Sequence, residues 1–264
     1  MQRLLTLLVL AVLLYGLVLA LMWWGQEHLL FLPTRLAPDY KLALERDVHE
    51  RTIELGDARL HALHLKLPAP RGVVFFLHGN AGNLESWFTD LQVYRQANFD
   101  LFMLDYRGYG KSSGRIESEA QLHADVRAAW DSIAPLYTGK KRVLLGRSLG
   151  SGPAAALALQ VHPDLTILVS PYTSMRALAG EVYPWVPTVL LRYPLATDET
   201  VARMRTPLLL LHGERDDIIP PHHAQALKRA QPQARLHIVK GAGHNDLQSF
   251  DDYDAALRTA LDGL

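Results

Sequence analysis

The chain of 264 residues contains no cysteine. It therefore cannot form a disulfide, use a thiol nucleophile or bind zinc through cysteine ligands. It also lacks net charge, because 27 Lys and Arg residues balance 27 Asp and Glu residues. A neutral chain without a basic cluster does not favour nucleic acid as its main partner. No H-E-x-x-H motif is present, so we expect neither a bound metal nor another cofactor.

The one long uncharged run lies at the N-terminus, from Leu4 to Trp24. As a helix it would extend about 31 Å, which matches a membrane hydrocarbon core of about 30 Å. Trp23 and Trp24 stand at its end, where aromatic residues commonly meet the membrane surface. We therefore predict a transmembrane anchor over residues 1–27 and an α/β domain over residues 28–264.

A cleaved signal peptide is the alternative interpretation of this run. It is disfavoured because the run is longer than the usual apolar region of about 7–15 residues, and Ala20-Leu21-Met22 matches a cleavage site poorly. The N-terminal amine and Arg3 precede the run, whereas the charges beyond it nearly cancel. The positive-inside rule then predicts a cytoplasmic N-terminus and a main domain on the far, periplasmic or extracytoplasmic side.

Beyond the anchor, short apolar runs alternate with helical segments. Gly72–Leu77 and Leu165–Val169 are continuous apolar runs, typical of strands buried on both faces of a parallel sheet. Gly56-Asp57 indicates a hairpin before them, and a helix is expected over about Leu84–Ala97. About six strand–helix repeats predict a mostly parallel sheet with helices on both faces.

Two stretches allow more than one interpretation. His61 and His64 lie in the second hairpin strand, and we interpret them as ordinary strand surface because no third metal ligand accompanies them. Residues 171–200 are too long for a simple crossover and predict a short cap after the sixth strand. Within this cap, the apolar Val182–Leu191 stretch could equally be a surface helix packed on the domain.

The strongest motif is Gly146-Arg147-Ser148-Leu149-Gly150, which follows the apolar run Arg142–Leu145. Strand, GxSxG and then small residues suited to a helix form the context of a nucleophile elbow. Glycines flank the serine because larger residues would collide in so sharp a turn. Ser148 is therefore a candidate nucleophile, and the alternative is a glycine-rich loop with an incidental serine.

A serine nucleophile needs a base and a group that orients the base. His244 is the candidate base and Asp216 the candidate orienting acid, since both directly follow predicted strands. The carboxyl ends of parallel strands share one sheet edge, so we expect these side chains to gather there with Ser148. The chain order Ser, Asp, His is that of α/β-hydrolases. The backbone N–H groups of Leu149 and Asn80 are candidates for an oxyanion hole, although the turn His78–Asn83 could also be only a tight loop.

Several other residues compete for these roles or lie near them. Asp217 and Asp246 are alternatives for the acid, and His222 and His223 compete weakly with His244. Arg107, in the motif Asp105–Gly110, is interpreted as a brace for its loop rather than as a chemical group.

Together these motifs resemble the α/β-hydrolase superfamily, in the branch of small, membrane-anchored, serine-aminopeptidase-like members that includes eukaryotic depalmitoylating hydrolases. The resemblance runs from about Leu29 to the C-terminus and implies an eight-stranded-type sheet. The family pattern Gly-x-x-Asp-x-x-Val-Pro assigns the acid to Asp216, with Ile219 in place of valine. The motifs that carry the resemblance are Phe31–Arg35, His78–Asn83, Asp105–Gly110, Gly146–Gly150, Gly213–Asp216 and Gly243–Asp246.

The sequence therefore favours a membrane-anchored serine hydrolase that cleaves an acyl ester, thioester or amide of a small or lipid-like substrate. An esterase is preferred to a peptidase because no acidic pair is evident for a peptide's free amine. The alternatives are a serine peptidase and a non-catalytic binding protein that keeps the fold. Halide displacement and epoxide opening are disfavoured because serine, not aspartate, occupies the elbow.

Overall fold

An eight-stranded sheet forms the centre of the computed structural model, which describes all residues from 1 to 264. The strand order across the sheet is β10-β9-β8-β7-β4-β6-β3-β2. The strands are β2 (Val48–Glu54), β3 (Arg59–Leu65), β4 (Gly72–Leu77), β6 (Phe99–Leu104), β7 (Lys141–Arg147), β8 (Leu165–Val169), β9 (Leu208–Gly213) and β10 (Arg235–Val239). A separate two-stranded pair joins β1 (Leu32–Pro33) to β5 (Ala81–Gly82).

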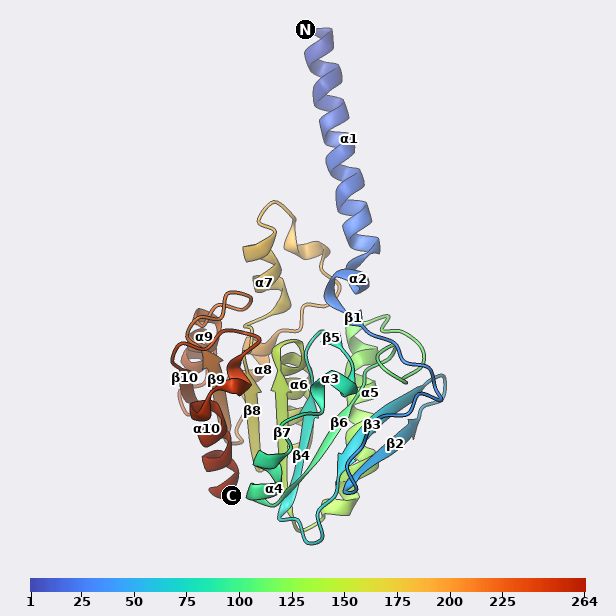
Figure 1. The fold of residues 1–264 in the computed structure, drawn as a ribbon. Coiled ribbons are helices and arrows are strands. Elements are labelled where there is room, and N and C mark those ends of the chain that lie inside the picture. The colour runs from blue at the N-terminus through green and yellow to red at the C-terminus, as the bar shows by residue number, and fades with distance from the viewer.

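The sheet is parallel except at the hairpin edge. β2 pairs antiparallel with β3, and β3 pairs antiparallel with β6, whereas every other pairing in the sheet is parallel. The carboxyl ends of the parallel strands therefore face the same edge, which is uppermost in Figure 1. The predicted fold class, a mostly parallel α/β sheet flanked by helices, is confirmed.

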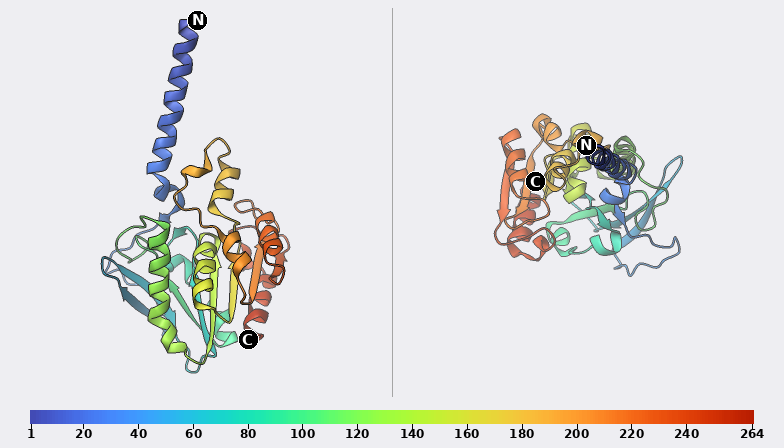
Figure 2. Two further views of the ribbon diagram at one scale, coloured as in Figure 1. Left: turned by 180° about the vertical axis from the view of Figure 1, so that it is seen from behind. Right: turned by 90° about the horizontal axis from the view of Figure 1, so that it is seen from above.

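Helices cover both faces of the sheet and bury one hydrophobic core on each (Figures 1 and 2). On one face lie α5 (Glu119–Ile133), α6 (Ser151–Val161), α8 (Thr197–Arg203) and α9 (His222–Ala230). On the other face lie α3 (Leu84–Trp87), α4 (Gln92–Ala97) and α10 (Asp251–Asp262). The continuous apolar runs in the sequence reflect this double coverage.

The helix expected over Leu84–Ala97 is wrong as a single element. α3 ends at Trp87, and α4 begins only at Gln92. Between them Asp90 adopts a left-handed φ of 53°, a conformation that short polar side chains tolerate but a continuing helix does not. The break turns α4 back onto the sheet.

The expectation that His61 and His64 lie on the strand surface is also wrong. His64 is fully buried, and its Nε2 lies 2.7 Å from the Tyr137 hydroxyl. His61 is 6% exposed, and its Nε2 lies 2.8 Å from Glu50 Oε2. The two side chains point to opposite faces of β3, where Tyr137 and Asp100 cover His64 and Glu50 and Asp105 lie against His61.

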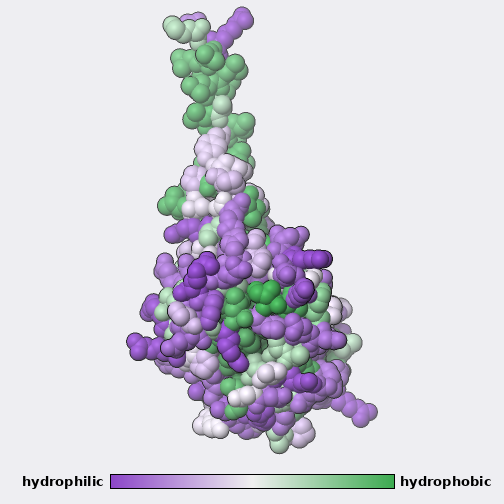
Figure 3. Space-filling model, turned by 90° about the vertical axis from the view of Figure 1, so that its left-hand side faces the viewer, coloured by the Kyte–Doolittle hydropathy of each residue, from purple (hydrophilic) through white to green (hydrophobic).

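The N-terminal helix α1 (Gln2–Trp24) projects away from the domain with no buried residue (Figure 1). It is long and apolar enough to cross a membrane, a property that it shares with signal sequences. Figure 3 shows hydrophobic side chains along α1 above a largely hydrophilic domain. The short helix α2 (Gln26–Leu30) joins it to the domain beside the cap, which contains α7 (Met175–Val182) and a single 3-10 turn, Thr188–Leu190.

Candidate active site

The turn after β7 holds Ser148 in a strained conformation. Its φ is 53°, in the left-handed region that a non-glycine residue rarely adopts. The two flanking glycines are sterically required. A Cβ on Gly146 would lie 2.4 Å from the Gly150 carbonyl oxygen, and a Cβ on Gly150 would lie 2.1 Å from the Leu77 carbonyl oxygen. The turn thus presents the serine at the carboxyl edge of the sheet.

Loops after two other strands bring His244 and Asp216 to the same place. His244 Nε2 lies 3.0 Å from Ser148 Oγ, and His244 Nδ1 lies 2.7 Å from Asp216 Oδ2. Asp216 follows β9, and His244 follows β10. All three side chains are at least nine-tenths buried. The expected gathering at one sheet edge is therefore present in the structure.

The surroundings of Asp216 favour its ionised form. Burial opposes ionisation, but hydrogen bonds from His212, His244 and the Ile219 amide outweigh it and hold the pKa of Asp216 well below its usual range. Asp216 Oδ1 accepts the Ile219 amide at 2.8 Å, and the Ile218 amide lies at 3.1 Å. Asp216 is therefore a fixed negative charge beside the imidazole.

The competing acids lie outside this arrangement. Asp217 is exposed and its side chain makes no hydrogen bond. Asp246 Oδ1 accepts the Gly243 amide at 2.7 Å and closes the turn that carries His244. Neither carboxylate contacts the imidazole of His244.

His222 and His223 face a different partner. Their Nε2 atoms lie 3.1 and 3.4 Å from the carboxylate of Glu181 on α7. These three residues are close enough together to suggest a metal site. However, the Thr173 amide donates to His223 Nδ1 at 3.3 Å, so the neutral ring carries its hydrogen on Nε2, where a metal would need a lone pair. The cluster instead links α9 to the cap helix.

The glycine-rich turn after β4 presents a free N–H group to the same site. His78 Nδ1 donates to the Gly79 carbonyl at 2.8 Å and fixes the Gly79–Asn80 peptide. The N–H at the other end of that peptide, on Asn80, donates to no backbone acceptor. Asn80, Ser148 and Leu149 line one cavity. The two candidate oxyanion-hole residues are thus both at the serine.

Two tyrosines of the motif Asp105–Gly110 brace this turn. The Tyr106 hydroxyl donates to the His78 carbonyl at 2.9 Å, and the Tyr109 hydroxyl donates to the Asn80 carbonyl at 2.6 Å. Arg107 points away and forms bidentate pairs with Asp57 and Asp125. The sequence-based interpretation of this motif as a structural brace agrees with these contacts.

Three residues at the site were not singled out from the sequence. Arg147 Nη2 donates to the His244 carbonyl at 2.9 Å, and its guanidinium stacks on the Trp87 ring at 5.4 Å. His212 Nε2 lies 2.7 Å from the Ile219 carbonyl and 3.3 Å from Asp216 Oδ2. A histidine at the end of an apolar strand was the available signal for His212, whereas nothing in the sequence indicated what Trp87 contacts.

The serine opens into a cavity of about 250 Å³ with largely apolar walls. One wall comes from the cap helix, through Met175 and Leu178, and another from α2, through Leu29 and Leu30. The cap therefore borders the site, as expected for residues 171–200. Space of this size and character fits an acyl group better than a charged substrate.

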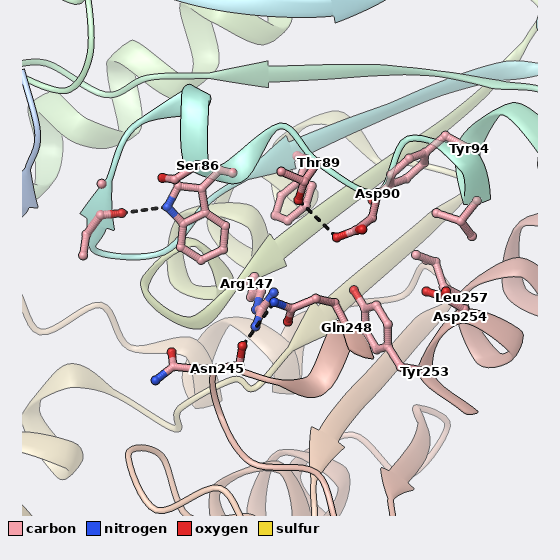
Figure 4. A pocket seen from close by; sticks show the side chains of 15 residues that line it. Ser86, Thr89, Asp90, Tyr94, Arg147, Asn245, Gln248, Tyr253, Asp254 and Leu257 are labelled. Carbon is pink, nitrogen blue, oxygen red and sulfur yellow. Dashed lines mark hydrogen bonds between the residues drawn. The ribbon is translucent and has the colours of Figure 1, made fainter. Parts of the chain in front are cut away.

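A second cavity of about 330 Å³ adjoins the first and shares Trp87 and Arg147 with it (Figure 4). Asp90 and Asp254 line this cavity. Burial, together with Asp90 and Asp251, raises the pKa of Asp254. The preference for an esterase, based on the absence of an evident acidic pair, did not consider Asp90 and Asp254, which are far apart along the chain.

Comparison with known proteins identifies the family to which this chain is similar. The chain matches the family described as "Serine aminopeptidase, S33" over residues 68–196 and that described as "TAP-like protein" over residues 188–261. It is 32% identical to alpha/beta hydrolase domain-containing protein 17B of Xenopus laevis over 197 residues, which cover 72% of this chain and 66% of that protein. It is 33% identical to protein 17C of Xenopus tropicalis, with 72% and 62% covered. The chain thus spans less than two thirds of the length of these relatives.

Solved structures agree on the fold. An esterase from Pyrococcus furiosus superposes with a TM-score of 0.68 at 18% identity, over 88% of this chain and 97% of the esterase. The strand order, the elbow after β7 and the relatives point to the same conclusion: this chain belongs to the α/β-hydrolase family.

Proposed function

We propose that this hydrolase is a serine hydrolase that cleaves an acyl ester, thioester or amide through an acyl-enzyme, with a carboxylesterase-type activity. The observation that carries the proposal is the hydrogen-bonded series from Ser148 Oγ through His244 to Asp216, at 3.0 and 2.7 Å. This series supplies a nucleophile, a base and an orienting acid in the geometry that acyl transfer requires.

In the first half-reaction, Ser148 Oγ attacks the acyl carbon while its proton passes to His244 Nε2. The developing oxyanion accepts hydrogen bonds from the N–H groups of Asn80 and Leu149. The negative charge of Asp216 stabilises the imidazolium and keeps Nδ1 protonated. His244 then gives its proton to the leaving oxygen, sulfur or nitrogen, and the acyl group remains on Ser148.

In the second half-reaction, water attacks the acyl-enzyme and gives a proton to His244 Nε2. Collapse of the second tetrahedral intermediate breaks the bond to Ser148 Oγ, which recovers its proton from His244. The products are a carboxylic acid and the free serine. No step needs a redox group or a second substrate besides water.

The proposal includes attachment to a membrane through α1 (Gln2–Trp24), supported by its apolar composition and by the absence of buried residues in it. The substrate is then a small or lipid-like acyl compound. Arg3 in the first turn of α1 favours a cytoplasmic N-terminus and a domain on the far side, as the positive-inside rule predicts.

Fluorophosphonate labelling of the full-length protein tests the mechanism. We expect the wild type to label and Ser148→Ala to lose all labelling. Asp216→Asn should slow labelling by up to about 10⁴-fold, because the imidazole loses its favoured tautomer. Asp217→Asn is the matched control and should label normally. A folded wild type that fails to label would favour a non-catalytic binding protein.

A serine peptidase is the second candidate, and Asp90 and Asp254 in the adjoining cavity favour it. These carboxylates could pair with the free amine of a peptide. Aminoacyl amides with a free and with an acetylated amine separate the two candidates. A peptidase should prefer the free amine and lose that preference in Asp90→Asn, whereas an esterase should show no such preference.

A further inference from the structure

The cap contains a ten-residue stretch without any charge, Val182–Leu191, which we call the cap loop. Most of its side chains lie outside the core, against which only Leu191 packs. Val182, Trp185 and Val189 are 56%, 51% and 79% exposed. Large apolar side chains gathered on one exposed loop mark a surface that meets another apolar partner.

The cap loop lies beside the N-terminal helix, as Figures 1 and 2 show. The Tyr15 hydroxyl donates to the Trp185 carbonyl at 2.7 Å. Leu19 and Met22 of α1 line an apolar groove together with Tyr183 and Val186 of the loop. The loop therefore contacts α1 at Tyr15, well before the helix ends at Trp24.

Polar contacts at the base of α1 fix this arrangement. Gln26 donates to the Leu190 carbonyl and accepts the Arg192 amide, both at 2.8 Å. Glu27 accepts the Tyr193 hydroxyl at 2.7 Å and pairs with the Arg192 guanidinium. The start of α2, directly after α1, is thus held against the cap by these contacts.

The contact at Tyr15 determines how deep the cap loop would lie in a membrane that α1 spans. At 1.5 Å per residue, Tyr15 lies about 13 Å along the helix axis from Trp24. If the membrane began only beyond Tyr15, the segment Gln2–Leu14 would extend about 20 Å, too short for a hydrocarbon core of about 30 Å. A spanning α1 therefore carries the cap loop into the membrane.

We propose that the cap loop inserts into the leaflet that adjoins the domain, and that its partner is the lipid bilayer. The composition of the loop suits this environment. Pro184 and Pro187 have no N–H group, and the Val186 and Leu190 amides donate to the Tyr183 and Pro187 carbonyls. The Trp185 carbonyl accepts from Tyr15, so these polar groups remain paired in the absence of water.

Insertion also determines where a substrate enters, a consequence that rests on the proposed function. Leu29 and Leu30 line both the groove beside α1 and the cavity at Ser148. An acyl chain that leaves the bilayer along α1 would pass these two residues and reach the serine without crossing water. Membrane-held acyl compounds would then be the favoured substrates.

Spin labels on single cysteines test insertion directly, because the chain has no other cysteine. Full-length Val189→Cys would be reconstituted in palmitoyl-oleoyl-phosphatidylcholine vesicles. Val12→Cys on α1 calibrates the lipid interior, and Leu136→Cys is a matched control, an exposed apolar position far from α1. Collision with oxygen, which concentrates in lipid, would be compared with collision with a water-soluble nickel chelate.

We expect the Val189 label to resemble the Val12 label, with oxygen collisions frequent and nickel collisions reduced several-fold relative to Leu136. Nickel access equal to that at Leu136 would overturn the proposal, as would a Val12 label outside lipid. Protection from both reagents would also overturn it, since that pattern marks a protein contact. The readout does not depend on catalysis, so it stands apart from fluorophosphonate labelling of the same samples.

Discussion

At the scale of single residues, the site depends on close backbone contacts that only glycine permits. A Cβ on Gly150 would meet the Leu77 carbonyl oxygen at 2.1 Å, and neither backbone can move without displacing β4 or the elbow. We predict that Gly150→Ala lowers the free energy of unfolding by about 1–3 kcal/mol or more. Gly56→Ala, where nothing lies within 4 Å, should change it by less than about 0.5 kcal/mol. Urea unfolding measures both, and equal effects would contradict the steric account.

The ionisation of Asp216 gives a prediction about pH. Its pKa in the folded protein is depressed below the unfolded value of about 3.9, so its ionised form contributes stability above that pH. This contribution is lost as the pH falls through the lower, folded pKa. Relative to Asp216→Asn, the wild type should therefore lose stability only below about pH 4. Unfolding curves at several pH values test this, and a constant difference between the two proteins would refute it.

Sequence reasoning located Ser148, Asp216 and His244 because each directly follows a predicted strand, and parallel strands end at one edge. It did not find Arg147, Trp87 and His212 as parts of the site. Their roles arise from contacts between loops: the Arg147 guanidinium bridges the Trp87 ring and the His244 carbonyl. Such contacts depend on loop conformations that no local pattern encodes.

At the scale of elements, Arg107 connects the hairpin turn to α5. Its guanidinium lies 2.7 Å from Asp57 Oδ2 and 2.7 Å from Asp125 Oδ2, and Asp125 is buried. Arg107→Met would leave a buried carboxylate unpaired and should cost about 3–5 kcal/mol of stability. Arg127→Met, which removes an exposed pair with Asp131, should cost less than about 1 kcal/mol. Denaturant unfolding of the two variants compares them, and similar losses would mean that the Arg107 cluster has no special structural role.

The predicted bounds of strands agree closely with the observed bounds where the strands are buried on both faces. β4 and β8 begin and end at the predicted residues, because a continuous apolar run is required there and the adjoining turns interrupt it. The prediction failed where tertiary contacts decide. The left-handed Asp90 divides the segment Leu84–Ala97, and contacts with Tyr137 and Glu50 bury His64 and His61.

At the scale of the whole molecule, the proposed anchor α1 would set the position of the domain. With Arg3 on the cytoplasmic side, the positive-inside rule would place the domain in the other compartment. We therefore predict that a membrane-impermeant maleimide labels Leu136→Cys in spheroplasts of an expressing bacterium before lysis. Labelling that requires lysis would reverse the orientation. The cysteine-free wild type serves as the blank.

The proposed function depends above all on Ser148 as the nucleophile of an acyl-transfer site. Peptide mass spectrometry of the fluorophosphonate-treated protein tests it most directly, because it reports which residue carries the adduct. We predict a single adduct on Ser148, lost when His244 is replaced by alanine. An adduct on the neighbouring Ser151, or none on a folded protein, would contradict it.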